Sequence, residues 1–457
     1  MVSHNVSKCS VLSQQTGNKE NLMKSMLVTL TIGSVMAAML VGAGTASAAI
    51  TVDSATLNAT QDAYVDQATP AVNYGSATTV ERKAGYYTST QKLPYVDFGA
   101  ANLLATVPAG AAVYRAQVAL DRLSATGDEK ARVEYVATAW NEATISYNVN
   151  PGYTTSRYGG PLGTGAGTTL LDVTTYVDTV RRAGSGAASY RLSGGGEDGG
   201  NTTVFSSREA GAGVAPKLTV EWVPATRLYT PGAKGTGRVL RLQEGWNGYT
   251  GTSDTYISNR GGGYAGNHGA EASYTLLENT WAGSISRGLV KFDLTSSGIN
   301  PAWTTVTSAT LVLMPGSFQT STSVPIQARE LLRPWTELGA TESTYDGTNA
   351  WAAAVAQGAG DQSAVVASTT LAASQWGMIY LDVTSSVMNW LNNPAANNGW
   401  IVDAVSSTGN IVYGISTSEG GSAAWRPQLW IQMDIIPEPA SGALLAVAGL
   451  LALRRRR

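Results

Sequence analysis

The feature that most constrains the fold is an internal repeat. Segments of the first half recur, in the same order, in the second half, and the clearest pair is VYRAQVAL at 113–120 with VTSATLVL at 306–313. The offset grows from 192 between Asp62 and Asp254 to 211 between Leu218 and Leu429, which fits insertions in loops. Because this period is far longer than the 20–50 residues of solenoid repeats, the sequence predicts two tandem domains.

Seven matched segments support this prediction. They pair Asp62–Val65 with Asp254–Ile257, Tyr95–Phe98 with Leu289–Phe292, Val113–Leu120 with Val306–Leu313, Trp140–Glu142 with Trp335–Glu337, Leu171–Thr174 with Leu381–Thr384, Ser207–Glu209 with Thr417–Glu419, and Pro216–Leu218 with Pro427–Leu429. A stretch rich in Pro, Gly and Thr separates the copies, as expected of an exposed linker. We therefore predict domains at 49–223 and 239–434, a linker at 224–238, and terminal segments at 1–48 and 435–457.

Each copy is predicted to be mostly β-strand. Leu218, Val220 and Trp222 alternate with polar residues, and Leu429, Ile431 and Met433 repeat the alternation. Period 2 indicates strands with one buried face. Short segments of this kind between Gly, Thr, Asn and Ser turns favour a sandwich or barrel. One short helix per copy is expected, with apolar residues at helical spacing: Val173, Tyr176, Val177 and Val180, then Val383, Val387, Trp390 and Leu391.

The N-terminal segment is predicted to be an export signal. Lys24 precedes an apolar stretch that ends in Ala46-Ser47-Ala48, which has the small-residue pattern of a cleavage site. Met23 is the expected true start of translation. A retained N-terminal anchor is the alternative. We expect the Sec machinery to export the chain and to leave a mature protein beginning near residue 49.

The C-terminal segment carries a Pro-Glu-Pro motif, a short apolar run and four arginines. The run Gly442–Leu453 is short for a membrane span, which needs about 20 residues. This order of parts resembles the PEP-CTERM sorting signal. The resemblance implies a protein that a Gram-negative bacterium exports and that is anchored transiently in the inner membrane. It also implies that an exosortase removes the tail before the protein is released to the surface or secreted. An ordinary tail anchor is the alternative. The residues that carry the signal are Pro437, Glu438, Pro439, Arg454, Arg455, Arg456 and Arg457.

The repeated motifs resemble the DNRLRE domain family. The first copy supplies Asp62, Tyr64, Asn73-Tyr74-Gly75, Trp140, Glu142, Asp172, Ser207-Arg208-Glu209 and Pro216. The second supplies Asp254, Tyr256, Lys291-Phe292-Asp293-Leu294, Trp335, Glu337, Asp382, Asn398-Gly399 and Glu419. The resemblance implies an all-β chain of two jelly-roll-type β-sandwiches that act as carbohydrate-binding modules in secreted or surface proteins. The second copy departs from the pattern because it lacks the Arg of Ser-Arg-Glu. Most shared residues are expected to be structural, with Arg208 and Glu209 as an ion pair.

Composition excludes several chemistries. The chain has one Cys and two His, and Cys9 and His4 both precede the predicted cleavage site. Disulfides, thiol catalysis and Cys-ligated metal sites are therefore excluded from the mature protein. The net charge of −2 does not favour a nucleic-acid partner. We predict no catalytic residue, metal ligand or cofactor. A calcium site is an open alternative, and the acidic cluster that could form it is Glu197-Asp198-Gly199-Gly200-Asn201.

Candidate glycan contacts are aromatic residues among amides and cations. Sugars present apolar C–H faces and hydroxyl groups, so a binding surface needs flat rings and polar donors. The Gly-rich segment 244–268 and a basic-aromatic patch in the first copy have this character. The candidates are Trp246, Tyr249, Arg260, Tyr264, His268, Trp281, Trp430, Lys83, Tyr86, Tyr87 and Lys92. The alternative for each region is an ordinary surface loop or a solvated strand.

The predicted function is non-catalytic binding of extracellular polysaccharide by an exported surface or matrix protein. The first alternative is a structural surface protein, in which Trp246, Trp281 and Trp430 would be buried in a domain interface. The second is a polysaccharide lyase or glycoside hydrolase, which would be favoured by a cleft that holds His268, Arg260 and Tyr264 in contact.

Overall fold

The computed structural model describes residues 49–436, apart from 86–88, 128–129, 195–199, 265, 280–282, 320–322, 372–376 and 406–410. The described residues lie in one compact unit. Among them, no helix has the length and apolar character needed to cross a membrane. The predicted cleavage site at Ala46 and Ala48 and the predicted sorting residues from Pro437 onward lie outside the described residues.

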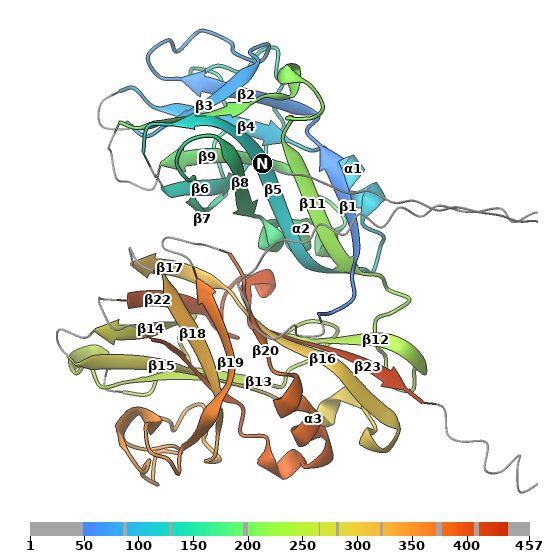
Figure 1. Ribbon diagram of the computed structural model, residues 1–457, viewed down its shortest axis with the longest axis vertical. Helices are drawn as coiled ribbons and strands as arrows, with labels where there is room; N and C mark the ends of the chain where they lie inside the picture. Colours follow the sequence, from blue (N-terminus) through green and yellow to red (C-terminus); the bar gives the residue numbers. More distant parts are fainter. Residues whose placement is uncertain are drawn as a thin grey trace, which may run out of the picture. The chain divides into compact units, whose positions relative to one another are not determined.

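The first repeat comprises β1 to β11 and two α-helices (Figure 1). Its strands are β1 (Asp53–Asn58), β2 (Gln61–Asp66), β3 (Thr79–Lys83), β4 (Lys92–Asp97), β5 (Ala112–Ala125), β6 (Lys130–Tyr135), β7 (Thr155–Pro161), β8 (Gly167–Asp172), β9 (Ser189–Gly194), β10 (Thr202–Ser206) and β11 (Lys217–Val223). Its helices are α1 (Ala100–Thr106) and α2 (Thr174–Ala183).

The second repeat comprises β12 to β23 and α3. Its strands are β12 (Gly235–Leu242), β13 (Thr252–Ser258), β14 (Ser273–Asn279), β15 (Ser284–Phe292), β16 (Thr304–Leu313), β17 (Pro315–Gln319), β18 (Val324–Leu331), β19 (Gln362–Leu371), β20 (Ile379–Asp382), β21 (Trp400–Ala404), β22 (Ile411–Ser416) and β23 (Gln428–Ile435). The helix α3 spans Thr384–Asn392. β12 begins inside the segment that the sequence assigned to the linker.

The two repeats have the same order of strand pairing. In the second repeat, one sheet has the order β12-β23-β16-β20 and the other the order β17-β22-β14-β15-β21-β18-β19, with β13 paired to β15. The first repeat has the equivalent orders, β1-β11-β5-β8 and β10-β3-β4-β9-β6-β7, joined into one continuous sheet. The join is β5, whose 14 residues pair first with β11 and β8 and then with β10. Its counterpart in the second repeat is divided into β16 and β17.

A hydrophobic core fills each repeat. β11 alternates between buried and half-buried residues along Lys217–Val223, as the sequence predicted. The aromatic side chains of Tyr190 and Phe205 are buried in the first core, and those of Trp390 and Trp400 in the second. The prediction of an all-β chain built of sandwiches is confirmed.

The short helix after each Leu-Asp-Val-Thr motif begins in the same way. The carboxylate of Asp172 accepts a hydrogen bond from the backbone N–H of Thr174 at 2.9 Å, and Asp382 does the same for Thr384 at 3.1 Å. A carboxylate at a helix N-terminus is favoured by the helix dipole. The helix α1 of the first repeat is additional, so the expectation of one α-helix per repeat was wrong for the first copy.

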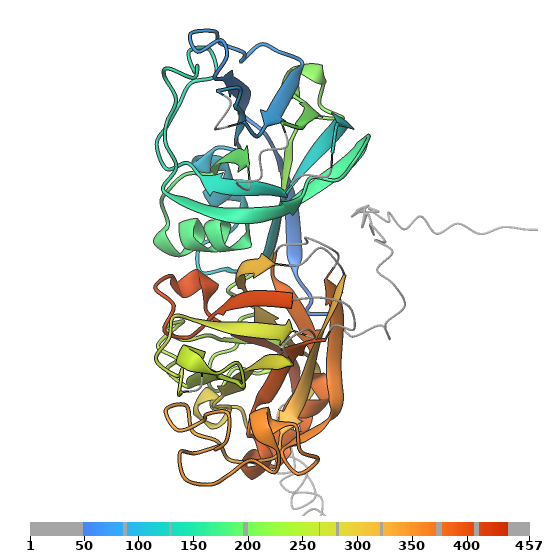
Figure 2. The same ribbon diagram turned by 90° about the vertical axis from the view of Figure 1, so that its left-hand side faces the viewer.

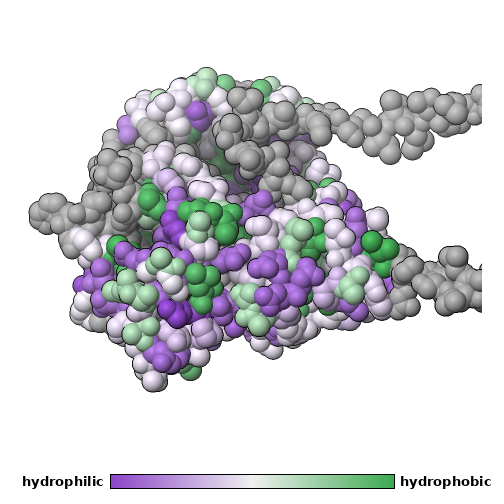
Figure 3. All heavy atoms as spheres, turned by 60° about the horizontal axis from the view of Figure 1, so that its bottom comes forward, coloured by the Kyte–Doolittle hydropathy of each residue, from purple (hydrophilic) through white to green (hydrophobic). Residues whose placement is uncertain are grey.

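The repeats differ most in the loop after the Trp-x-Glu motif. In the first repeat β7 begins at Thr155, shortly after Trp140, whereas in the second repeat β19 begins only at Gln362, well after Trp335. The longer loop is the group of orange turns beside β18 and β19 in Figures 1 and 2. Outside the grey atoms, the face shown in Figure 3 mixes hydrophobic and hydrophilic residues and carries no continuous apolar surface.

Candidate functional site

An open groove of about 600 Å³ lies in the first repeat beside Trp140. The loop that follows β6 forms all of it, from Thr138 to Pro151. Its apolar part includes the half-buried Trp140 and Val149, whose side chain is 66% exposed. The lining residues are Thr138, Ala139, Trp140, Asn141, Thr144, Ile145, Asn148, Val149, Asn150 and Pro151.

Several polar groups in this groove are available to a ligand. Thr138, Asn141 and Asn148 are exposed. Among the described residues, the side chains of Thr138 and Asn148 make no hydrogen bond. The side-chain amide of Asn141 uses only its Oδ1, which accepts from the backbone N–H of Ala143 at 2.8 Å. An aromatic ring flanked by free amides and a hydroxyl has the composition that a sugar ligand requires.

The groove is held in shape by groups behind it. The indole N–H of Trp140 donates to Ser189 Oγ at 2.8 Å, and its ring packs edge-on against Tyr95 with centroids 5.7 Å apart. The Tyr95 hydroxyl lies 2.8 Å from Asn150 Oδ1 and 2.9 Å from Pro151 O, which form one end of the groove. These contacts fix the rings and amides before a ligand arrives, which reduces the entropic cost of binding.

The repeated Asn-x-Gly motif anchors the other end of the loop. In the first repeat, the Asn73 amide nitrogen donates to Glu142 O and Ile145 O, both at 2.7 Å. Gly75 has no room for a side chain because a Cβ would overlap the carbonyl oxygen of Glu142. The ring of Tyr74 stacks on that of Tyr64, with centroids 4.3 Å apart.

The second repeat reproduces this anchor with different residues. Asn267 donates to Glu337 O at 2.6 Å and to Ala340 O at 2.9 Å, and a Cβ at Gly269 would overlap the Glu337 carbonyl. His268 takes the place of Tyr74 and stacks on Tyr256 at 3.8 Å. Asn267-His268-Gly269 was not among the repeated motifs identified from the sequence, in which His268 stands where the first repeat has Tyr74.

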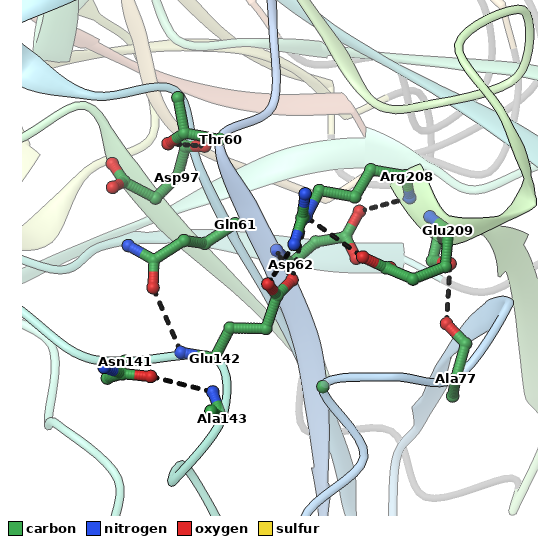
Figure 4. A network of polar contacts seen from close by, with 12 residues as sticks. Thr60, Gln61, Asp62, Ala77, Asp97, Asn141, Glu142, Ala143, Arg208 and Glu209 are labelled. Atoms are coloured by element: carbon green, nitrogen blue, oxygen red, sulfur yellow. Dashed lines mark hydrogen bonds and ion pairs between the residues drawn. The ribbon is translucent and has the colours of Figure 1, made fainter.

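A group of three carboxylates stands at the base of each loop. The first triad is Asp62, Glu142 and Glu209, and the second triad is Asp254, Glu337 and Glu419. Within each triad, one carboxylate oxygen of every residue lies within 4.8 Å of the others. In the first triad the Arg208 guanidinium binds both oxygens of Glu142, with Nε–Oε1 at 3.0 Å, and lies 3.1 Å from Glu209 Oε1 (Figure 4).

The first triad is polar yet largely removed from solvent. Asp62 is buried, and it accepts a hydrogen bond from the backbone N–H of Arg208 at 2.8 Å. Burial, together with the charges of Glu209 and Glu142, raises the pKa of the Asp62 carboxyl to about 7. The predicted ion pair of Arg208 with Glu209 is present, and Glu142 is its second partner.

In the second repeat the position equivalent to the groove is covered. Trp335 is buried in a small cluster with Trp351 and Val355 from the longer loop. Its indole N–H donates to Asn398 O at 2.7 Å. Val355 adopts a strained φ of 50°, and its carbonyl accepts from the buried Arg287 guanidinium at 3.1 Å. The longer loop therefore packs over the tryptophan whose counterpart lines the groove in the first repeat.

Two of the predicted glycan contacts are buried, and their assignment was wrong. Trp430 has no exposed surface, and its indole N–H donates to Gln428 Oε1 at 2.8 Å. It packs edge-on against Tyr114 with centroids 5.3 Å apart. His268 is 3% exposed, and its ring nitrogens lie 2.6 Å from Glu271 Oε1 and 3.1 Å from Tyr264 O.

Trp246 and Tyr249 come together as predicted, but not on a flat exposed face. They line a cavity of about 510 Å³ with Asn247. The Trp246 ring is half-buried between Arg182 and Arg241, each 4.5 Å from its centroid. This ring therefore already has cationic partners.

The remaining candidates have mixed outcomes. Arg260 is exposed and lies 4.5 Å above the ring of the half-buried Tyr264. Lys92 is paired with Glu81 at 2.6 Å and with Asp66 at 3.5 Å, so its charge is balanced. Lys83 is half-buried at the end of β3. Four predicted sites lie wholly or mainly outside the described residues: Trp281, Tyr86, Tyr87 and the acidic cluster at 197–201, of which only Gly200 and Asn201 are described.

A comparison with known protein families finds a match within the first repeat. Residues 53–222 match the model of carbohydrate-binding module family 96. The match runs from the first residue of β1 almost to the end of β11, so the matched residues contain the entire groove. The match supports carbohydrate binding by the first repeat. The resemblances to the DNRLRE and PEP-CTERM families stay predictions.

Other comparisons add no argument. No curated protein matches the sequence. Among solved structures, similarity is found to the Macrobrachium rosenbergii nodavirus, at 11% identity over 90% of this chain and 97% of that one, with a TM-score of 0.17. The tandem CBM22-1-CBM22-2 domain of Paenibacillus barcinonensis Xyn10C matches at 10% identity over 85% of this chain and all of that one, with a TM-score of 0.14.

The groove of the first repeat was missed at the sequence level. Trp140 was interpreted mainly as a core or loop anchor, with ligand contact as the alternative, and Asn141, Asn148 and Val149 were passed over. The sequence did contain an indication of this site, because the stretch from Trp140 to Pro151 holds three asparagines and the apolar Val149. Only the position of this loop over Tyr95 shows which of these side chains remain free.

Proposed function

We propose that the protein is exported to the cell surface, where it binds an extracellular polysaccharide through the groove of its first repeat. The observation that carries this proposal is the match of residues 53–222 to a carbohydrate-binding module family, combined with an open groove in the same residues. Trp140 and Val149 offer apolar contact to the C–H face of a sugar ring, and Asn141, Asn148 and Thr138 offer partners for its hydroxyl groups.

Binding without catalysis is supported by the state of the acidic residues. Glu142, the carboxylate next to the groove, is held by the Arg208 guanidinium and by the backbone N–H of Asp62. In the second repeat, both nitrogens of His268 face acceptors inside the protein. Arg260, Tyr264 and His268 do meet, as a lyase would require, but His268 is buried rather than presented to a cleft.

The terminal segments carry the rest of the proposal. The apolar stretch ending at Ala48 would direct Sec export, and the Pro-Glu-Pro motif with its terminal arginines would hold the chain in the inner membrane until an exosortase removes the tail. The mature protein would then reach the cell surface or the extracellular matrix, where polysaccharide is available.

A structural role is the second candidate, and one observation favours it. Trp430 and the half-buried Trp246 belong to a cluster that also includes Ile50, Ala112 and Val223 of the first repeat. Burial of these tryptophans among residues of both repeats is the outcome that a structural protein predicts. A protein of this kind would use the paired sandwiches as a rigid spacer, with no sugar ligand.

Affinity electrophoresis of the full chain through gels that contain acidic or neutral polysaccharides tests the two candidates. We expect retardation in at least one gel. Replacing Trp140 with Ala should weaken binding at least about tenfold, as for a central aromatic contact. Asn148→Ala, which removes an exposed side chain, should weaken it with no effect on folding. Trp303→Ala is the matched control, because Trp303 is 37% exposed in the second repeat.

Retardation that survives both groove substitutions would refute the groove as the binding site. Absence of retardation in every gel would favour the structural role.

A further inference from the structure

The two carboxylate triads have the same backbone setting. The Asp62 N–H donates to Glu142 Oε1 at 2.8 Å, and the Asp254 N–H donates to Glu337 Oε1 at 2.7 Å. The Oδ2 atom of each Asp accepts a hydrogen bond from a backbone N–H at 2.8 Å. The donor is the residue that precedes the third carboxylate, Arg208 in the first repeat and Ser418 in the second. The triads are therefore equivalent in place.

They differ in charge balance. In the first triad, Arg208 supplies a positive charge that touches two of the three carboxylates. In the second triad, the equivalent residue is Ser418, whose hydroxyl donates to Glu419 Oε1 at 2.9 Å. Among the described residues, no Lys, Arg or His forms an ion pair with Asp254, Glu337 or Glu419.

The neighbouring charges increase this imbalance. The Glu244 carboxylate lies close enough to raise the pKa of Glu337, after burial and together with Glu419. Arg426, the nearest arginine along the chain, donates instead to the backbone carbonyls of Gly420 and Glu244, at 3.0 and 3.2 Å.

Asp254 also has an unused ligand atom. Its side chain has no exposed surface, and its Oδ1, like Asp62 Oδ1 in the first triad, makes no hydrogen bond. The difference between the triads is that the Arg208 guanidinium is paired with carboxylates of the first triad. Burial and the nearby Glu419 raise the pKa of Asp254 well above its ordinary value. A buried carboxylate oxygen without a donor, in a residue whose carboxylate lies within 4.8 Å of two others, is costly unless a cation or a proton satisfies it.

We propose that Asp254, Glu337 and Glu419 bind a calcium ion, and that Arg208 takes the place of this ion in the first repeat. All the ligand atoms are oxygens, which Ca²⁺ prefers over softer nitrogen or sulfur ligands. The ion would tie β13 to the loop that begins at Trp335 and to the turn after β22. In the first repeat the Arg208 guanidinium makes the same connection through Glu142 and Glu209.

Calorimetric titration of the chelator-treated full chain with CaCl₂ tests the proposal. We expect one ion per chain. Glu419→Gln should weaken binding at least tenfold, whereas the matched change Glu209→Gln in the first triad should leave both the stoichiometry and the affinity unchanged. Calcium should also raise the melting temperature of the wild-type chain.

Ser418→Arg is the decisive variant, because it copies the arrangement of the first triad. It should abolish calcium binding while the chain stays folded, and its melting temperature should no longer respond to calcium. Binding of two ions per chain, no binding up to 10-fold above the ~1 mM dissociation constant of weak extracellular sites, or unchanged binding by Ser418→Arg would each overturn the proposal. Equal affinity for Mg²⁺ would overturn the assignment to calcium.

Discussion

The buried ion pair between Arg191 and Glu134 should dominate the stability of the sheet behind the groove. Arg191 Nε lies 2.5 Å from Glu134 Oε2, and their side chains are only 11% and 4% exposed. Replacing Arg191 with Met keeps most of the aliphatic volume but leaves the Glu134 carboxylate, within the described part of the chain, with only the Ser193 hydroxyl as a donor, at 2.7 Å. Breaking a buried pair on one side costs about 3–5 kcal/mol. At about 2–4 °C per kcal/mol for a domain of this size, the melting temperature should fall by about 6–20 °C.

Differential scanning calorimetry of the Arg191→Met variant measures this fall. The matched control is Arg115→Met, which breaks the ion pair with Glu221, where Arg115 is 42% exposed. A solvent-exposed pair contributes about 0–1 kcal/mol, so the control should shift the transition little. In a Glu134→Gln background, Arg191→Met should cost at least about 1 kcal/mol less, because no buried charge is left unpaired. Equal costs in the two backgrounds, or a cost no larger than that of the control, would refute the reasoning.

Three further predictions concern the groove and its base. Because the Asp62 pKa is raised to about 7, the folded state binds more protons than the unfolded state between about pH 4 and 7. The free energy of unfolding should therefore fall as pH rises through that window. Chemical denaturation at several pH values should show this dependence, and it should be weaker in Asp62→Asn. Tyr95→Phe removes a hydroxyl that contacts Asn150 Oδ1 and Pro151 O at one end of the groove and accepts from Arg191 Nη1 at 3.1 Å. It should weaken polysaccharide retardation several-fold and lower stability by about 1–3 kcal/mol, because a buried donor loses its partner. Gly75→Ala should destabilise the chain by about 1–3 kcal/mol because its Cβ overlaps the Glu142 carbonyl, whereas Gly152→Ala, with open space around the added Cβ, should not; equal melting temperatures would contradict the overlap.

The two repeats share the same strand pairing and repeated motifs but differ in the surface formed by the loop after the Trp-x-Glu motif. The triad, the Asn-x-Gly anchor and the Trp-x-Glu motif recur in both copies with nearly the same hydrogen bonds. In the first copy the loop after Trp140 is short and leaves the groove open. In the second copy the loop closes over Trp335 and forms its own small core. The two copies therefore present different surfaces at this position.

Much of this shared structure was predictable from local pattern. The alternation at Leu218, Val220 and Trp222 identified a strand with one buried face, and apolar residues at helical spacing identified the helix after each Leu-Asp-Val-Thr motif. The role of Trp140 was only partly predicted, since the residue both anchors the loop and lines the groove. Trp430 was misassigned because a strand pattern shows which residues share a face, but not whether another part of the chain covers that face.

The sequence by itself determined the duplication, the β-sandwich class and the residues that repeat, because hydrophobic periodicity and recurring motifs depend on neighbours along the chain. The tertiary structure alone decided which repeated residues meet and which aromatic faces remain free. Asp62, Glu142 and Glu209 are separated by up to 147 residues, yet their carboxylates converge on one point. Such convergence depends on strand pairing and loop length, and these set the three-dimensional distances that no local pattern records.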